Sequence, residues 1–186
     1  YDDAGNTRQA GDSSFLIDTV SPTAFTLTAP AQGAETRATS VAFTWSAPTD
    51  TQSGVNRYQI RVSTLSTFAT LAVDSSTALA ANTTIVLPAN ETYYWRVIAY
   101  DDAGNTRQVG DSSFLIDTVS PTAFTLTAPA QGAETRATSV GFTWSAPTDT
   151  QSGLNRYQIR VSTLSTFATL AVDSSTALAA NTTIVL

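Results

Sequence analysis

The chain is built on a 99-residue period that is repeated almost without change. Residues 1–87 recur as residues 100–186, and 84 of these 87 aligned positions are identical. The three differences exchange small or aliphatic residues: Ala10/Val109, Ala42/Gly141 and Val55/Leu154. The period is too long for a solenoid unit of roughly 20–50 residues. It suits a self-contained domain of roughly 100 residues, so we expect a string of near-identical domains.

Alternation of apolar and polar residues with a period of two dominates each repeat. It covers residues 41–46, 58–63 and 93–100, each with one apolar face. Trp45 and Trp95 lie on the inward faces of the first and third of these segments, and Trp144 holds the place of Trp45 in the second copy. Weaker strand signals separated by turn residues lie at Phe25–Ala29, Phe68–Val73, Thr83–Leu87 and Ser113–Ile116. No stretch has a convincing helical period. About seven short strands per repeat predict an all-β sandwich.

The composition limits the chemistry of the chain. It contains no Cys, His, Lys or Met, and its nine basic residues are all Arg. Because common nucleophiles and bases are missing, we predict no enzymatic activity. The net charge of −6 argues against nucleic acid or an anionic membrane as a partner, since both bind basic surfaces. No apolar run approaches the ~20 residues that span a bilayer.

Several motifs resemble one family of extracellular domains. They are Phe43-Thr44-Trp45-Ser46, Tyr58-Gln59-Ile60-Arg61-Val62-Ser63, Tyr93-Tyr94-Trp95-Arg96-Val97-Ile98-Ala99-Tyr100-Asp101 and Ala103-Gly104-Asn105. Together they look like the fibronectin type III and bacterial Ig-like repeats of large cell-surface proteins. The resemblance implies tandem two-sheet sandwiches that serve as spacers, adhesion modules or accessory domains. Leu87-Pro88 with Tyr93 resembles the tyrosine corner of that family.

The segment Asp117–Pro121, which matches Asp18–Pro22, is the expected boundary between repeats. Proline ends strand pairing and holds the preceding residue extended. We therefore expect three parts. Residues 1–19 would be the FG loop and G strand of a preceding repeat, residues 20–118 a complete repeat, and residues 119–186 an incomplete repeat without strands F and G.

An incomplete sandwich would expose the inner faces of Trp144, Tyr157 and Ile159. Two explanations stay open. Neighbouring copies in a longer array would supply the rest, or the Tyr1–Asp18 segment of one chain would complete the open sandwich of the next. Strand G alone does not replace strand F, so we favour the longer array.

The resemblance also gathers acidic residues at one end of the complete repeat. The BC and FG loops lie at the end where the linker enters, which brings together Asp18, Asp50, Asp101, Asp102 and Asn105. Oxygen ligands from several loops are what Ca²⁺ prefers, which predicts a Ca²⁺ site that stiffens the junction. The alternative is that these residues form ordinary turns and keep the surface soluble, because their spacing matches neither an EF-hand nor an RTX repeat.

Two surface features complete the set of candidates. Asn-x-Thr triplets, the acceptor pattern for N-glycosylation, begin at Asn82, Asn90 and Asn181. On the strand at 93–100, Tyr94, Ile98 and Tyr100 lie with Arg96 on the face opposite Trp95. They either form a stripe that binds a partner or stabilise the sheet as cross-strand neighbours.

From these observations we predict a structural spacer or stalk repeat of a long extracellular adhesin or filament on a bacterial cell surface. Its partners would be other copies of the same repeat or chain, joined into fibres by strand complementation. The alternatives are a glycan- or protein-binding adhesion module that acts by avidity, and an accessory domain of a secreted hydrolase.

Overall fold

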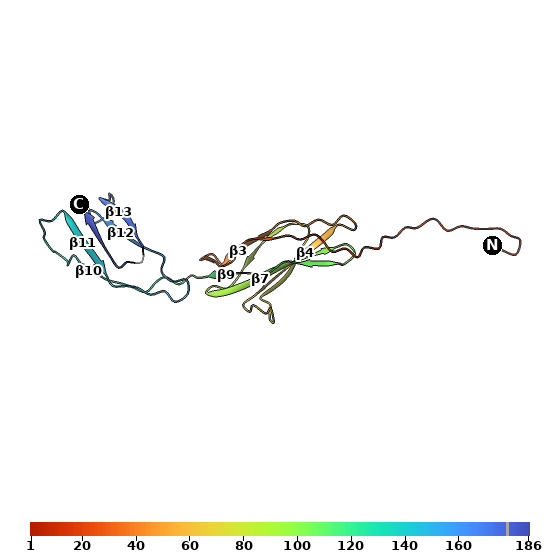
Figure 1. Ribbon diagram of the computed structural model, residues 1–186, viewed down its shortest axis with the longest axis horizontal. Coiled ribbons are helices and arrows are strands. Elements are labelled where there is room, and N and C mark those ends of the chain that lie inside the picture. The colour runs from red at the N-terminus through yellow and green to blue at the C-terminus, as the bar shows by residue number, and fades with distance from the viewer. Residues whose placement is uncertain (178) are drawn as a thin grey trace. The chain divides into compact units, whose positions relative to one another are not determined.

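The computed structural model describes residues 1–177 and 179–186 (Figure 1). All regular structure within these residues is β-strand, which confirms the predicted all-β class. The chain divides into two compact units. Unit 1 comprises residues 1–34 and 39–115, and unit 2 comprises residues 35–38 and 116–186. Within the described part of the chain, no helix has the length and apolar character needed to cross a membrane. The expected division into residues 1–19, 20–118 and 119–186 stays a prediction.

The first repeat folds into a sandwich of two sheets. One sheet has the order β1-β3-β6, with bounds Leu27–Ala29, Ser40–Trp45 and Asn82–Val86. The other has the order β2-β9-β7-β4-β5, and β8 also pairs with β7. Its strands are β2 Ala34–Thr36, β4 Val55–Ser63, β5 Val73–Thr77, β7 Glu91–Asp101, β8 Thr106–Gln108 and β9 Ser112–Ile116.

Aromatic side chains from both sheets fill the space between the layers. Phe43 of β3 lies edge-on to Trp95 of β7 at 5.1 Å between ring centroids, and to Phe114 of β9 at 5.7 Å. Trp45 makes a similar contact with Tyr58 at 5.5 Å. These contacts follow from the alternation, because residues two apart on a strand face the same side. Trp45, Trp95 and Trp144 are all buried on the inward faces of their strands, as predicted.

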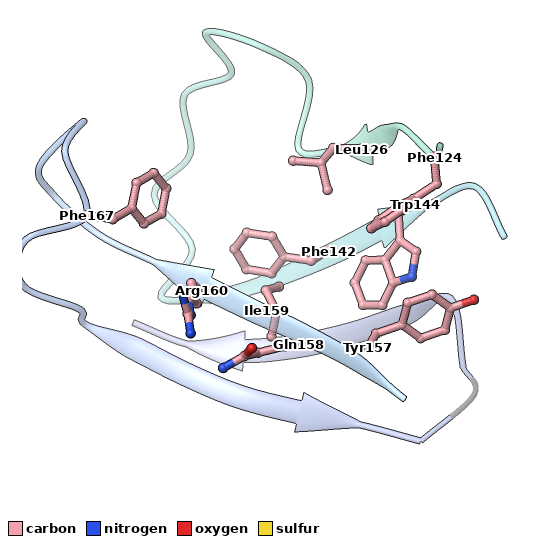
Figure 2. A pocket seen from close by; sticks show the side chains of 9 residues that line it. All are labelled: Phe124, Leu126, Phe142, Trp144, Tyr157, Gln158, Ile159, Arg160 and Phe167. Carbon is pink, nitrogen blue, oxygen red and sulfur yellow. The ribbon is translucent and has the colours of Figure 1, made fainter. Parts of the chain in front are cut away.

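The expectation that residues 119–186 would expose the inner faces of Trp144, Tyr157 and Ile159 is wrong for the first two. Trp144 and Tyr157 bury each other by an edge-on contact at 5.2 Å, and Ile159 is half-buried (Figure 2).

The tyrosine corner is formed as the resemblance implied. The Tyr93 hydroxyl donates a hydrogen bond to the carbonyl oxygen of Pro88 at 3.0 Å. Tyr93 is almost fully buried, and its ring stacks on Phe114 at 5.7 Å. Burial raises the pKa of the Tyr93 phenol. The bond therefore fixes the segment that leads into β7 against the core.

The expected strand at Phe68–Val73 is wrong for all but its last residue. A turn lies there instead, and β5 begins only at Val73. The Ser63 hydroxyl donates to the Thr70 carbonyl at 2.6 Å and accepts from the Leu65 peptide nitrogen at 2.9 Å, which closes the loop. Phe68 adopts φ 55°, a left-handed conformation that no strand residue takes. Its ring is held by the guanidinium of Arg96, 3.6 Å from the ring centroid.

The described residues of unit 2 form five strands of the second repeat in two small sheets. One sheet has the order β10-β11-β14, and the other pairs β12 with β13. The bounds are Leu126–Ala128, Ser139–Trp144, Tyr157–Val161, Val172–Thr176 and Asn181–Val185 for β10 to β14. The register of β11 against β14 is that of β3 against β6, shifted by the 99-residue period. Residues 133–135, which correspond to β2, are described but form no strand.

Candidate functional site: an aspartate cluster at the entry of the first sandwich

Three aspartates converge where the chain enters the first sandwich. Asp18 lies in the incoming segment, Asp50 follows β3, and Asp101 ends β7. One carboxylate oxygen from each lies within 4.8 Å of one from each of the others. Asp18 and Asp101 are buried, and Asp50 is half-buried. Of the five residues that were predicted to gather here, the topology brings together these three aspartates and Asn105, whose amide donates to Asp101 and to the Asp18 carbonyl.

Ser53 holds the carboxylate of Asp18. Both its hydroxyl and its peptide nitrogen, the latter at 3.1 Å, donate to Asp18 Oδ2, and the Val20 peptide nitrogen donates to Oδ1 at 2.8 Å. The Ser53 hydroxyl is the largest cause that holds the pKa of Asp18 below its usual value, followed by the Val20 nitrogen. Donors that bond the ionised form favour it over the neutral form. These hydrogen bonds therefore favour the ionised form of the Asp18 carboxylate.

The other two carboxylates are fixed by their own loops. Asp50 Oδ1 accepts hydrogen bonds from the peptide nitrogens of Gln52, Ser53 and Gly54 at 3.0–3.2 Å. Asp101 accepts from the peptide nitrogen of Asn105 at 2.7 Å and from its amide at 2.8 Å. Gly104 adopts φ 94° inside this second loop, a conformation that glycine reaches at little cost.

Asn105 fastens the incoming linker to the sandwich. Its side-chain amide donates to the carbonyl oxygens of Asp18 at 3.1 Å and Val20 at 3.3 Å. Arg107 adds a third tie, from its Nε to the Pro22 carbonyl at 3.1 Å. The linker is therefore held by hydrogen bonds at three successive points, all from the FG loop and β8.

Asp102 lies outside the cluster. Its carboxylate accepts a hydrogen bond from the side-chain amide of Asn56, and its side chain is exposed. Adjacent residues at the end of a strand point to opposite faces, so Asp101 and Asp102 could not both turn inward. The sequence did not distinguish them because both were assigned to one loop.

The linker arrangement recurs at the start of the second repeat. Ser152 donates to Asp117 Oδ2 from its peptide nitrogen at 3.1 Å, and its side chain is the largest cause of the lowered pKa of Asp117. Asp149 accepts three peptide nitrogens, as Asp50 does. The FG loop also recurs at Asp2, which accepts from the Asn6 nitrogen and amide at 2.8 Å each. The FG-loop half of the site therefore forms from a short stretch of sequence, whereas the linker half joins residues 35 positions apart in both repeats.

The geometry of the three carboxylates fits a hard divalent cation. Two ligands on opposite sides of a Ca²⁺ ion are separated by about 4.8 Å, twice a calcium–oxygen distance of roughly 2.4 Å. The ion pairs of the described residues join Arg61 to Asp74, Arg96 to Asp111 and Arg160 to Asp173, so none of them neutralises the cluster. The hydrogen bonds from the peptide nitrogens described above partly compensate the negative charge of the carboxylates, and the same hydrogen bonds are also ordinary features of turns.

The remaining candidates occupy separate surfaces. Asn82 and Asn181 begin strands β6 and β14 and are exposed, whereas Asn90 is half-buried with φ 64° before β7. On the outer face of β7, Tyr100 is half-buried under Arg57, whose guanidinium lies 3.6 Å from the ring centroid. The Tyr100 hydroxyl donates to Gln59 at 2.7 Å.

Ser53 is the functional residue that the sequence did not reveal. It sits in a Ser-Gly turn among many serines, and its partner Asp18 is 35 residues away. No spacing rule joins the two. Its recurrence as Ser152 follows from the repeat and could not have singled it out.

Comparison with known proteins identifies the first repeat. A family model described as the bacterial Ig-like domain matches residues 27–118. Residues 27–118 are a bacterial Ig-like domain. Residues 126–186 repeat residues 27–87 of this Ig-like domain with two substitutions, Ala42/Gly141 and Val55/Leu154. Bacterial Ig-like domains are typically non-catalytic and are typically found in extracellular or surface proteins.

Solved structures support the same fold. The crystal structure of the FN1–FN3 domains of chicken CNTN1 matches with a TM-score of 0.53 and 13% identity, over 89% of this chain and 55% of that one. At this identity the likeness shows the fold alone. A Streptomyces avermitilis α-L-rhamnosidase in complex with L-rhamnose has a TM-score of 0.39 and 17% identity, over 63% of this chain and 13% of that one. No curated protein sequence matches the chain.

Proposed function

We propose that the chain is a spacer region of a long adhesin or filament on a bacterial cell surface, and that its Ig-like repeats set distance without catalysing a reaction. The observation that carries this proposal is the fastened linker. Asn105 donates a hydrogen bond to the backbone carbonyl of Asp18, and Ser53 donates to the Asp18 carboxylate. Ser152 donates to the Asp117 carboxylate at the equivalent place in the second repeat. A linker tied to the domain that follows it has few free residues left to act as a hinge.

The near-identity of the repeats supports the same role. A spacer gains length by duplication of a unit, and each sandwich advances the chain by roughly 30–40 Å, judged from strands of about ten residues at ~3.3 Å per residue. The acidic balance of the chain, −6 at neutral pH, helps an exposed stalk to stay soluble.

We further propose that Ca²⁺ binds the aspartate cluster and tightens the linker. The cluster joins the linker through Asp18, the BC loop through Asp50 and the FG loop through Asp101. A cation shared by three segments would add to the hydrogen bonds that already hold them, and it would reduce the repulsion among three like charges.

A binding module is the second candidate. Tyr94 and Tyr100 are half-buried on the outer face of β7, where Arg57 covers the Tyr100 ring. Equivalent surfaces on each repeat would act together by avidity. The contacts of Tyr100 with Arg57 and Gln59 favour a stabilising role instead, because both its ring and its hydroxyl already have partners.

A binding assay separates the two candidates. The full chain would be immobilised and exposed to a panel of surface glycans and extracellular matrix proteins. The spacer proposal predicts no saturable binding. Saturable binding that is lost in a Tyr94→Ala, Tyr100→Ala variant, and retained in a Thr106→Ala control on neighbouring β8, would favour the binding module.

A further inference from the structure

The sheet formed by β1, β3 and β6 carries no charged side chain. The three stretches of the first repeat that contain these strands, residues 22–34, 38–49 and 75–90, lack Asp, Glu, Arg and Lys altogether. The charged residues of this repeat belong to the opposite sheet and to the loops. On the outer face of the uncharged sheet, Ala42 of β3 lies beside Thr84 of β6, and both are exposed.

β6 lies at the free edge of this sheet. It is the last strand in the order β1-β3-β6 and pairs with β3 on one side. The Trp45 nitrogen donates to the Ala81 carbonyl at 3.1 Å, and the Leu87 nitrogen donates to the Thr39 carbonyl at 2.9 Å. Hydrogen-bonded positions alternate along an antiparallel pair. The even-numbered residues of β6 therefore direct their peptide groups away from β3 and toward solvent.

The other strands at the ends of the two sheets are protected against pairing. β1 has three residues, a register shift and Pro30 directly after it. β2 has three residues and carries Glu35. β5 carries Asp74, whose carboxylate lies 3.6 Å from the Nε of Arg61. Short length, irregular register, proline and charge are the features by which natural sheets avoid edge-to-edge association.

β6 has none of these features. Its five residues, Asn-Thr-Thr-Ile-Val, include no charge and no proline, and their register against β3 runs without a shift. Thr, Ile and Val are residues that favour strands. Val86 is 74% exposed at the end of the strand. An uncharged and regular edge of this kind is a template for a further strand.

A second copy of the chain is the partner that fits this edge. The chain has a net charge of −6, so two copies repel each other except where neither presents a charge. A two-fold axis through Thr84 would place two copies of β6 antiparallel, with Asn82 of one copy opposite Val86 of the other. Because the outward peptide groups belong to these three positions, the pair would exchange about six main-chain hydrogen bonds.

We propose that β6 of one chain pairs with β6 of a second copy, so that two three-stranded sheets join into one and the chains associate side by side. The same strand recurs with the 99-residue period, because β14 repeats the sequence of β6 and has the same register against β11. One pairing buries little surface and is weak, whereas several pairings along two chains act together. Lateral pairing goes beyond the spacer role and does not depend on it.

The test is sedimentation velocity of the full 186-residue chain from micromolar to millimolar concentration, where reversible association is expected. Thr84→Lys together with Thr183→Lys, both at exposed positions, should weaken the association at least about tenfold, because like charges would lie opposite each other across the axis. Ser76→Lys together with Ser175→Lys, at exposed positions of β5 and β13, is the matched control and should leave the association nearly unchanged. Both double variants add two positive charges, so a difference between them does not come from net charge.

Thr84→Pro together with Thr183→Pro tests the role of the backbone. Proline removes the outward N–H that the pairing needs, and an edge strand tolerates it where that N–H faces solvent. Urea denaturation should therefore show a folded chain, and sedimentation should show that its association is lost.

Four results would overturn the proposal. They are a chain that stays monomeric at every concentration, equal weakening by the two lysine pairs, undiminished association of the folded proline variant, and a proline variant that does not fold. The last result would show that the N–H of Thr84 is bonded within its own sheet. The spacer proposal would survive each of them, because its own tests measure binding to other molecules and length.

Discussion

Ser53 donates its hydroxyl and its peptide nitrogen to one carboxylate oxygen of Asp18, a residue 35 positions earlier in the chain. This pair ties the linker to the BC loop. It also has a pH dependence whose sign can be worked out, because the Ser53 donors hold the pKa of Asp18 below its usual value.

A carboxyl whose pKa is lowered by folding stabilises the folded state above its unfolded pKa of ~3.9, and this contribution is lost as the pH falls through the folded pKa. We expect Ser53→Ala to lower Tm at pH 7 and to lower it progressively less toward about pH 2. Asp50 and Asp101 face the same carboxylate, so the variant and the unsubstituted chain are compared with each other at every pH, in the same buffer. Exposed Ser66→Ala is the control. A loss of Tm that does not depend on pH would show that the hydroxyl acts independently of the Asp18 charge.

The calcium proposal predicts that millimolar Ca²⁺ raises Tm more than equal Mg²⁺, because the smaller ion demands a tighter octahedral shell. Asp101→Asn should remove most of that shift. Asp102→Asn, which removes the same charge one residue away and outside the cluster, should retain it. Calorimetry in chelated and calcium-loaded buffer measures both. Equal loss in the two variants would mean that calcium acts through net charge alone.

The tyrosine corner predicts a small and specific effect. Tyr93→Phe removes the bond from its hydroxyl to the Pro88 carbonyl and should lower the free energy of unfolding by about 0.5–1.5 kcal/mol. Tyr94→Phe, on the half-buried opposite face, should change it by far less. Urea denaturation followed by tryptophan fluorescence compares them. Indistinguishable midpoints for the two variants would count against a stabilising corner.

The left-handed Phe68 gives a test of backbone strain. Phe68→Ala and Phe68→Gly both lose the ring that Arg96 covers, but only glycine relieves the positive φ. We therefore expect the glycine variant to be more stable than the alanine variant by about 1 kcal/mol, the lower end of the usual cost of that conformation. The reverse order would indicate that the loop changes conformation when the ring is removed.

Much of this fold could be predicted because the alternation is strict where the core is deepest. Phe43, Trp45 and Trp95 face inward as their spacing requires, and their strands begin and end close to the expected residues. The segment Phe68–Val73 has equally apolar residues but folds as a turn. In that segment the Ser63 side chain donates a hydrogen bond to the Thr70 backbone carbonyl. The Arg96 guanidinium also covers the ring of Phe68 and so stabilises a left-handed backbone conformation that phenylalanine rarely adopts.

The loops that form the site could be predicted from the sequence, but the individual contacts between their side chains could not. The resemblance placed Asp18, Asp50 and Asp101 at one end of the sandwich, and the structure brings their carboxylates together. The different position of Asp102 depends on which way a strand ends, and the role of Ser53 depends on a contact between distant segments. Local sequence contains neither.

If the chain is a spacer, each 99-residue repeat adds length and does not itself bind a surface ligand. In the most direct measurement, the chain is displayed on a cell between a membrane anchor and a tip domain whose ligand is known, and one 99-residue period is inserted or removed. Electron microscopy then records the height of the tip domain above the cell surface. A spacer gives a constant increment of roughly 30–40 Å per period with unchanged binding by the tip. An increment that vanishes, or adhesion that grows with the number of repeats in a tipless chain, would contradict it.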